Sequence, residues 1–197
     1  MRLLLASRNA KKLAELRRIE AFSGVSVIGL DDVPAYPEAP EDGATFEENA
    51  LLKAREAVRY TGLPSVADDS GLAVDALNGC PGIFSARWSG RHGDDEANNA
   101  LLLAQLSDVP ESRLTARFVA AAAYVDADGH EVVVRGEMPG RLLRAPRGSG
   151  GFGYDPLFVP YGSELTSAEL SPQEKDAISH RGKALRALAE QIAPYLR

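Results

Sequence analysis

The spacing of hydrophobic and polar residues divides the chain into short apolar runs and longer amphipathic stretches. Continuous apolar runs are typical of buried strands, and they occur at residues 2–6, 25–29 and 65–74. Polar residues 68–71 interrupt the third run, so we expect that strand to be broken there. Apolar residues that repeat with helical spacing predict helices at residues 10–22, 45–60, 94–106 and 181–196.

The middle of the chain predicts a long hairpin. Its arms are residues 114–126 and 130–137, with the turn at Asp128-Gly129, and residues 141–145 predict one more strand. Strands and helices alternate through the first half of the chain. The pattern as a whole predicts an α/β protein with a mixed sheet and a cleft between two lobes.

Three polar signatures mark predicted helix starts. Thr45 with Glu48, and Thr166 with Glu169, have the spacing of a capping box. The third, Ser171-Pro172-Gln173-Glu174, adds a proline at the first helical position, where its missing N–H costs nothing.

Composition narrows the class of protein. A net charge of −6 argues against a broad nucleic-acid-binding face, which is usually basic. Cys80 is the only cysteine, so an intrachain disulfide and a thiolate metal cluster are excluded. We find no apolar run long enough to span a membrane and no signal peptide, and we expect a cytoplasmic protein.

The first strand leads into a polar turn that predicts an anion site. Residues Ser7, Arg8, Asn9, Ala10, Lys11 and Lys12 join the strand to the next helix. Cations are disfavoured at a helix N-terminus because the macrodipole is positive there. Two lysines at this place suggest a bound anion held by backbone N–H groups, although a plain turn with solvated lysines also fits.

Adjacent carboxylates at Asp68-Asp69-Ser70-Gly71 predict a second site. Neighbouring side chains in a strand point to opposite faces, so one aspartate is expected to face the cleft and the other to anchor the structure. Magnesium prefers one or two carboxylates plus phosphate and water oxygens. Glu41, in the acidic and proline-rich loop 31–43, is a natural second ligand. A polar turn without a metal is the alternative.

A glycine-rich loop near the end of the chain predicts a place where a flat ligand stacks. Residues 150–156 read Gly-Gly-Phe-Gly-Tyr-Asp-Pro, and Lys175, His180 and Arg181 supply hydrogen-bond donors further along. A nucleotide fits this combination, and a tight turn with core aromatics is the alternative. Lys53, on the second helix, and Arg87, beside Trp88, are further candidates for phosphate contacts. For Lys53 the alternative is a surface lysine whose aliphatic stem covers apolar residues.

These stretches occur in one order along the chain, and together they resemble the motif set of the inosine triphosphate pyrophosphatase family. The motifs are Ser7-x-Asn9-x-x-Lys12, Thr45-Phe46-x-x-Asn49-Ala50-x-x-Lys53-Ala54, residues 67–72, Pro81-Gly82-Ile83-x-Ser85-Ala86-Arg87, residues 150–156 and Ser179-His180-Arg181. The resemblance covers essentially the whole chain and implies one domain, residues 1–197, with two lobes around a long central mixed sheet.

The resemblance also implies an activity and roles for particular residues. Members hydrolyse ITP, dITP and XTP to the monophosphate and pyrophosphate with Mg²⁺, usually as homodimers. Asp69 resembles the proton acceptor, and Glu41 with Asp69 resembles the metal site. Residues 7–12, Lys53 and Ser70 resemble the phosphate and sugar contacts. The base-pocket residues are Phe152, Gly153, Tyr154, Asp155, Lys175, His180 and Arg181.

Small departures and two other functions stay open. Arg8 stands where glycine is common in the family, Ser7 where threonine is common, and Cys80 where a small residue is usual. A septum-inhibition-type pyrophosphatase acting on pyrimidine or modified nucleotides has a similar fold. A nucleotide-binding regulatory module without turnover is the other alternative, and it leaves the acidic loop near Asp68-Asp69 unexplained.

Overall fold

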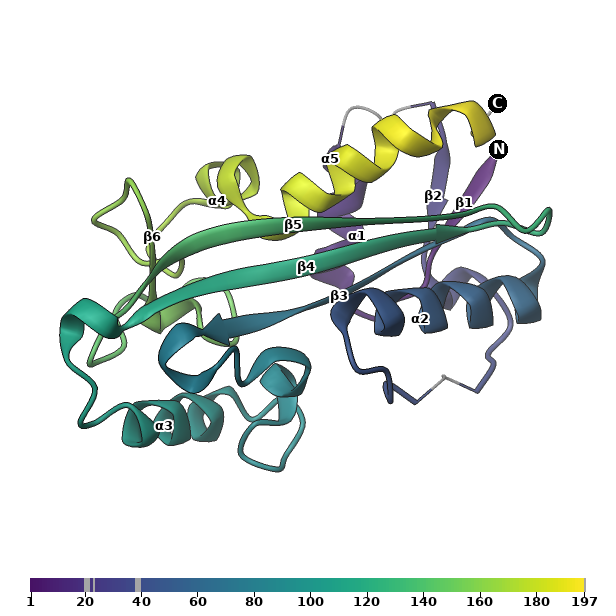
Figure 1. The fold of residues 1–197 in the computed structure, drawn as a ribbon. Coiled ribbons are helices and arrows are strands. Elements are labelled where there is room, and N and C mark those ends of the chain that lie inside the picture. The colour runs from purple at the N-terminus through teal and green to yellow at the C-terminus, as the bar shows by residue number, and fades with distance from the viewer. Residues whose placement is uncertain (20–21, 23, 38–39, 197) are drawn as a thin grey trace. The chain divides into compact units, whose positions relative to one another are not determined.

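The computed structural model describes residues 1–19, 22, 24–37 and 40–196, and of Lys11 and Glu15 it describes only the backbone. One mixed sheet has the strand order β2-β1-β3-β4-β5-β6 (Figure 1). β1 pairs in parallel with β2 and with β3, whereas β5 and β6 are antiparallel. The strands are β1 Arg2–Leu5, β2 Ser26–Ile28, β3 Ser65–Val74, β4 Thr115–Val125, β5 Glu131–Leu142 and β6 Phe158–Pro160.

Helices connect these strands and complete an α/β fold, as predicted. The α-helices are α1 Ala10–Arg18, α2 Phe46–Thr61, α3 Asp95–Gln105, α4 Pro172–Ile178 and α5 His180–Ile192. Short 3₁₀ turns lie at Leu30–Asp32, Asp75–Leu77, Gly82–Arg87, Glu111–Arg113, Asp155–Leu157 and Ala193–Tyr195. Among the described residues, no helix is both long and apolar enough to cross a membrane.

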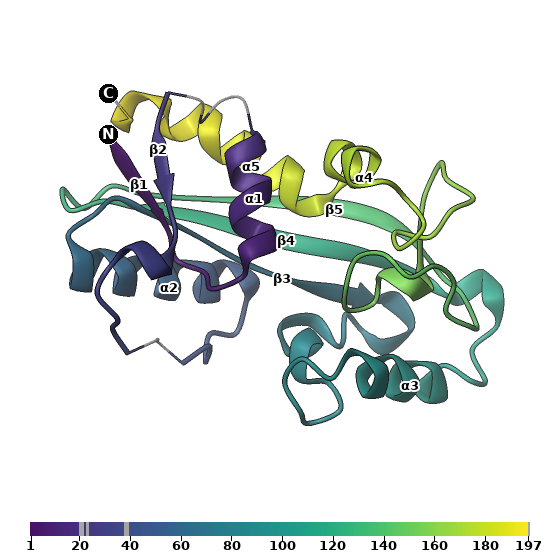
Figure 2. The same cartoon turned by 180° about the vertical axis from the view of Figure 1, so that it is seen from behind.

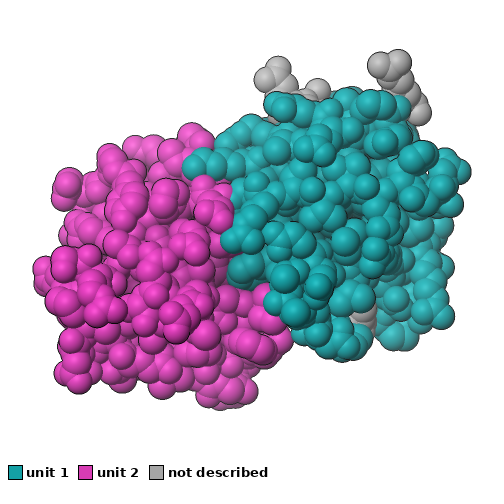
Figure 3. All heavy atoms as spheres, in the orientation of Figure 1, with its two compact units in different colours: residues 1–69, 120–136, 180–197 teal, residues 70–119, 137–179 magenta. Residues whose placement is uncertain are grey.

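The chain forms two compact units, and each is assembled from separate stretches of sequence (Figure 3). The first unit contains residues 1–69, 120–136 and 180–197, and the second contains residues 70–119 and 137–179. β3, β4 and β5 therefore each contribute residues to both units. The cleft between two lobes stays a prediction.

In the first unit, helices cover both faces of the strands. α1 and α5 lie on one face and α2 lies on the other (Figures 1 and 2). Alternate strand residues such as Leu3 and Leu5 pack with Leu16 of α1 and Leu188 of α5 in one core cluster. This packing follows from the two-residue period of a strand, which gives each face its own set of side chains.

The second unit has a core of its own. Leu72 and Phe118, from β3 and β4, pack with Leu102 of α3 and with Tyr154 and Phe158 from the later loop and β6. The rings of Phe118 and Phe158 meet edge to face, with centroids 4.7 Å apart. This core fixes the stretch that contains the glycine-rich loop.

The structure corrects two predicted strands and one predicted helix start, and it contains one strand that was not predicted. β3 runs without a break through Asp68-Asp69, and no separate strand forms at 141–145 because β5 continues to Leu142. β6, only three residues long, was not predicted. Glu169 accepts a hydrogen bond from the Thr166 backbone N–H at 2.8 Å, yet only a turn forms there.

Candidate active site

Asp68 and Asp69 are neighbours in β3 and contact different helices. Asp68 meets side chains of α1 and α5, whereas Asp69 meets side chains of α2. Those helices lie on opposite faces of the strands (Figure 2). The prediction that the two carboxylates point to opposite faces is confirmed, and it follows from the alternation of side chains along a strand.

Asp68 is a buried carboxylate between two cations. Its Oδ2 lies 2.8 Å from Lys12 Nζ and accepts a hydrogen bond from Arg181 Nε at 3.1 Å. Only 3% of Asp68 and 5% of Arg181 are exposed. Lys12 opens α1, where the sequence suggested a bound anion to offset the helix dipole. Asp68 is that anion in this structure, so the position of Lys12 does not by itself require a ligand.

Burial and charge oppose each other in this cluster. Burial alone would raise the pKa of Asp68, but Lys12, Arg181 and Lys53 outweigh it and hold that pKa far below its usual range. Burial lowers the pKa of Lys12, and the attraction of Asp68 opposes that shift only in part. Asp68 is therefore ionised, and its charge stabilises the two cations beside it.

Asp69 is held by α2 and by the acidic loop before it. Asn49 Nδ2 donates to Asp69 Oδ2 at 3.1 Å, and Lys53 Nζ donates to Asp69 Oδ1 at 3.0 Å. The same Lys53 nitrogen donates to Glu41 Oε1 at 2.9 Å. Burial raises the pKa of Asp69, with a further contribution from Glu41, although Lys53 opposes the shift. A raised pKa makes this carboxylate a better proton acceptor than an ordinary aspartate.

Glu41 and Asp69 fit a hard divalent cation. Their carboxylate oxygens already converge on one positive centre, the Lys53 ammonium. Magnesium takes oxygen ligands and is usually bound through one or two carboxylates together with phosphate oxygens. Burial alone would lower the pKa of Lys53, but Asp69, Asp68 and Glu41 together raise it, so this lysine stays charged beside the two carboxylates.

Local hydrogen bonds position the first loop and α2. Asn9 Oδ1 accepts from the Lys12 backbone N–H at 3.3 Å and so starts α1, and Ser7 Oγ accepts from the Asn9 N–H at 3.2 Å. Thr45 caps α2 by accepting from the Glu48 N–H at 3.1 Å, as predicted. Arg8 and Ala10 are exposed, Ser70 is half-buried in β3, and the Lys11 side chain lies outside the described residues.

The start of α5 lies against a glycine on β5. A side chain at Gly136 would place its Cβ 2.2 Å from the His180 carbonyl oxygen and 2.7 Å from the Ala184 nitrogen. Only glycine allows this close approach. The close approach places the buried residues His180 and Arg181 against the strands. The need for glycine at position 136 was not predicted.

The second unit holds the glycine-rich loop. The buried Asp155 carboxylate accepts from the Phe152 N–H at 2.9 Å and pairs with Lys175. Lys175 Nζ lies 5.4 Å from the centroid of the Phe152 ring, which is 39% exposed. Gly151 has φ +72° and leaves no room for a Cβ beside Asp155. These contacts hold one aromatic ring at the surface.

The two aromatic residues of that loop differ in accessibility. Tyr154 is buried, and its hydroxyl donates to the Ser85 carbonyl at 2.8 Å, while burial raises its pKa. Phe152 is therefore the ring that can stack on a flat ligand. Two contacts of Gly153 were missed: its N–H donates to Asp95 at 2.6 Å, and its carbonyl accepts from Asn99 at 2.9 Å. The Arg87 guanidinium lies over the Phe84 ring, 5.4 Å from its centroid.

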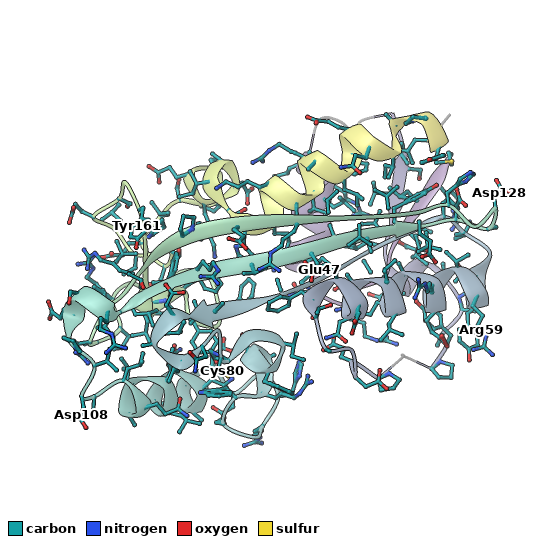
Figure 4. All side chains as sticks on the ribbon, viewed as in Figure 1. Glu47, Arg59, Cys80, Asp108, Asp128 and Tyr161 are labelled. Atoms are coloured by element: carbon teal, nitrogen blue, oxygen red, sulfur yellow. The ribbon has the colours of Figure 1, made fainter. Side chains whose placement is uncertain are left out.

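The predicted residues thus fall into two groups. The metal candidates Glu41 and Asp69 lie in the first unit with Ser7 to Lys12, Lys53, His180 and Arg181. The candidates Ser70, Arg87, Phe152 to Asp155 and Lys175 lie in the second unit. A third group, at the hairpin turn that Asp128 marks in Figure 4, was not predicted. One ligand atom each of Asp126, Asp128 and His130 lies within 4.8 Å of the others. Asp126 Oδ1 accepts hydrogen bonds from the backbone N–H groups of Asp128 and His130, and these bonds account for the turn.

Comparison with known proteins points to one family. A family model described as the Ham1 family matches residues 3–191. A dITP/XTP pyrophosphatase of Nocardia farcinica is 68% identical over 98% of this chain and 95% of that protein. A crystal structure described as nucleoside-triphosphatase / dITP/XTP pyrophosphatase, from Mycobacterium abscessus, has 64% identity and a TM-score of 0.81 over 95% of this chain and 98% of that one.

A solved structure with lower sequence identity also has this fold. The Ham1 protein of Staphylococcus aureus is 36% identical and superposes with a TM-score of 0.90 over 99% of this chain and 100% of its own. This chain therefore has the same fold as those proteins. The predicted family resemblance is confirmed. The chain belongs to the Ham1 family.

Proposed function

We propose that this protein hydrolyses the non-canonical purine nucleoside triphosphates ITP, dITP and XTP to the monophosphate and pyrophosphate. Hydrolysis would remove these nucleotides from the cellular pool. The observation that carries the proposal is the pair of carboxylates in β3. Asp68 pairs with Lys12 and Arg181, and Asp69 pairs with Lys53. The relatives named as dITP/XTP pyrophosphatases, at up to 68% identity, support the same activity.

The proposed reaction is attack of water on the α-phosphorus. A P–O bond forms to the water oxygen, the bond from the α-phosphorus to the bridging oxygen breaks, and pyrophosphate leaves. Asp69 takes the proton of the water, a role that suits its raised pKa. Lys12 and Lys53 stabilise the negative charge that develops on the phosphate oxygens.

A charge count favours a metal cofactor. Lys12, Lys53 and Arg181 face the three acids Glu41, Asp68 and Asp69, so this cluster is balanced without substrate. A triphosphate adds several negative charges and needs a further cation. We propose Mg²⁺, held by Glu41 and Asp69, which would polarise the phosphate oxygens when bound.

Base selection is proposed to rest on hydrogen-bond donors and one stacking ring. Hypoxanthine and xanthine carry an acceptor oxygen at position six, where adenine carries an amino donor. Donors from His180 and Arg181 would pair with the oxygen and be left unsatisfied by adenine, at about 1–3 kcal/mol for each donor. Lys175, Asp155 and the backbone of Gly153 and Tyr154 would frame the base, and Phe152 would stack on it.

The remaining parts of the proposal concern organisation. Residues 1–197 act as one domain, with Ser7 to Lys12 and Ser70 at the phosphates and sugar. The protein works as a homodimer in the cytoplasm, without nucleic-acid or membrane partners.

One substrate panel tests the proposal. Pyrophosphate release is measured with ITP, dITP, XTP, ATP, GTP and dTTP, each in Mg²⁺ and in EDTA. We expect release from the first three substrates in Mg²⁺ and none in EDTA. Preference for dTTP would instead indicate a pyrimidine-directed pyrophosphatase, and binding without any release would indicate a regulatory module.

A further inference from the structure

Two tyrosines join the acidic loop to the far end of α2. Tyr36, in the loop before α2, stacks on Tyr60 in the last turn of that helix, with ring centroids 5.2 Å apart and an interplanar angle of 10°. The guanidinium of Arg59, which Figure 4 labels on this helix, lies 5.7 Å from the centroid of the Tyr60 ring. Tyr36 is half-buried although Tyr60 is 47% exposed.

The same loop has a second contact with α2. Glu41 accepts a hydrogen bond from Lys53 at 2.9 Å. Lys53 and Tyr60 are seven residues apart, which is about two helical turns or roughly 10 Å along the axis, and both therefore lie on one stripe of α2. The loop meets this stripe in the reverse order, first through Tyr36 and then through Glu41.

At the start of the loop the Gly29 N–H donates to Asp32 Oδ2 at 2.9 Å, and three prolines follow along the loop. Pro34, Pro37 and Pro40 lack the backbone N–H groups that a strand or helix would use. Side chains of α2 hold the end of the loop. The Gly43 N–H donates to Asn49 Oδ1 at 2.9 Å, and the Ala44 N–H donates to the Glu48 carboxylate. Among the described residues, the tyrosine stack is a side-chain contact that joins the loop to α2 on the N-terminal side of Glu41.

We infer that Tyr36 and Tyr60 are positioning residues that hold Glu41 at Lys53 and Asp69 and so set the strength of metal binding. The inference rests on the proposed function, in which Glu41 is a magnesium ligand. Tyr60 lies seven residues beyond Lys53 on α2, and the stack is proposed to act on Glu41 through the loop. Tyr36 and Tyr60 are therefore expected to alter metal dependence more than turnover at saturating metal.

The activity test compares Mg²⁺ titrations of pyrophosphate release from ITP. In Tyr36→Ala and Tyr60→Ala we expect the half-activating Mg²⁺ concentration to rise about 3- to 10-fold, which corresponds to the usual strength of an aromatic pair. The kcat at saturating Mg²⁺ should stay within about twofold. Tyr36→Phe keeps the stack and should restore the wild-type titration, and Tyr161→Ala, which removes another exposed ring, should not change it.

A second readout needs neither metal nor activity. In hydrogen exchange on the metal-free protein, the amides of Gly43 and Ala44 should exchange about 3- to 10-fold faster in Tyr36→Ala than in wild type or Tyr36→Phe. Tyr36→Leu replaces Tyr36→Ala if the latter does not accumulate. Unchanged exchange together with an unchanged Mg²⁺ titration in both alanine variants would overturn the inference.

Glu41→Gln separates failure of this inference from failure of the proposed function. If that variant raises the half-activating Mg²⁺ concentration while the tyrosine variants do not, Glu41 is a ligand and the stack does not position it. If wild type releases no pyrophosphate, or Glu41→Gln leaves the titration unchanged, the proposed function or its metal site is wrong. In that case, hydrogen exchange at the Gly43 and Ala44 amides would still show whether the tyrosine stack holds the loop.

Discussion

Asp68 and Asp69 share a peptide bond but have opposite electrostatic surroundings. Asp68 lies between Lys12 and Arg181, and its pKa is held far below the usual range, whereas burial raises the pKa of Asp69. One carboxylate is thus stabilised in its charged form and the other is made more basic. Substitution of each residue by asparagine should therefore have opposite consequences for stability and activity.

Asp69→Asn should lower kcat for ITP by about 100- to 10,000-fold, because it removes the proposed proton acceptor. The fold should be at least as stable as wild type, since the native protein carries this charge at a cost. Pyrophosphate release, calorimetric binding of ITP and a thermal melt together check this. Glu96→Gln, an exposed change on α3, should leave all three measurements unaltered. Wild-type turnover by Asp69→Asn would remove Asp69 from the base role.

Asp68→Asn should destabilise the ligand-free protein, because Lys12 and Arg181 would lose their buried counter-charge. Removal of one partner of a buried pair costs about 3–5 kcal/mol. For a protein of this size each kcal/mol lowers Tm by about 2–4 °C. Asp128→Asn, at the exposed hairpin turn, is the matched control and should melt within a degree or two of wild type. An equal Tm for Asp68→Asn and wild type would show that the pair contributes nothing.

The stability contributed by Asp68 should also depend on pH in a defined direction. Its native pKa is depressed, so its stabilisation is complete above the unfolded pKa of about 3.9 and is lost as pH falls further. The Tm difference between wild type and Asp68→Asn should be constant from about pH 7 to 5 and narrow towards pH 3. A difference that widened on acidification would mean that Asp68 is not the ionised partner of the two cations.

Lys12→Ala should raise KM for ITP and also lower Tm, because this lysine contacts Asp68 as well as the proposed phosphates. A hydrogen bond to a charged group is worth about 1.5–3 kcal/mol. The double variant with Asp68→Asn should be less destabilised than the sum of the single variants. Lys183→Ala, an exposed lysine on α5, serves as the control. Strict additivity would indicate that the two residues do not interact.

Phe152→Ala should weaken binding of every purine substrate by a similar factor, because a stacking ring does not read the base edge. Loss of a base–aromatic stack costs about 1–3 kcal/mol, or about 5- to 150-fold in affinity. The ratio of kcat/KM for ITP and ATP should stay within about threefold, and Tm should hardly change because Phe152 is partly exposed. Phe152→Tyr keeps a ring and should bind nearly normally. A selective loss of ITP would assign Phe152 a role in discrimination.

Local signals in the sequence gave correct predictions. The Thr45 cap and the Ser171–Glu174 capping box depend on residues three positions apart, and both form as expected. The division of Asp68 and Asp69 between two faces depends only on the period of a strand. The Thr166–Glu169 signature forms one turn, in which the Leu170 N–H donates to the Thr166 carbonyl at 3.2 Å. No helix follows because Ser171 is extended, with ψ 155°, before Pro172, which has no N–H to continue the helix.

Distant contacts explain the errors. A break in β3 was predicted because residues 68–71 interrupt its apolar run. The strand continues because Lys12, Lys53 and Arg181, from three other elements, compensate the charges of Asp68 and Asp69. Similarly, Arg141 belongs to β5 because that strand pairs with Val159 of β6, a strand too short to recognise from its own residues. The need for Gly136 is visible only once α5 lies against it.

The division of each unit among separate stretches of sequence has a consequence for synthesis on the ribosome. Residues 1–69 emerge early, yet Leu185, Leu188 and Ile192 of their core are translated more than a hundred residues later. Translation proceeds at about 5–20 residues per second, so α5 is synthesised on the order of ten seconds after the β1–β3 segment. The second unit ends at Ser179 and has all its residues before then. The unit whose sequence is completed last is thus the one that holds Asp69, so a stalled nascent chain lacking α5 should expose apolar surface and recruit chaperones.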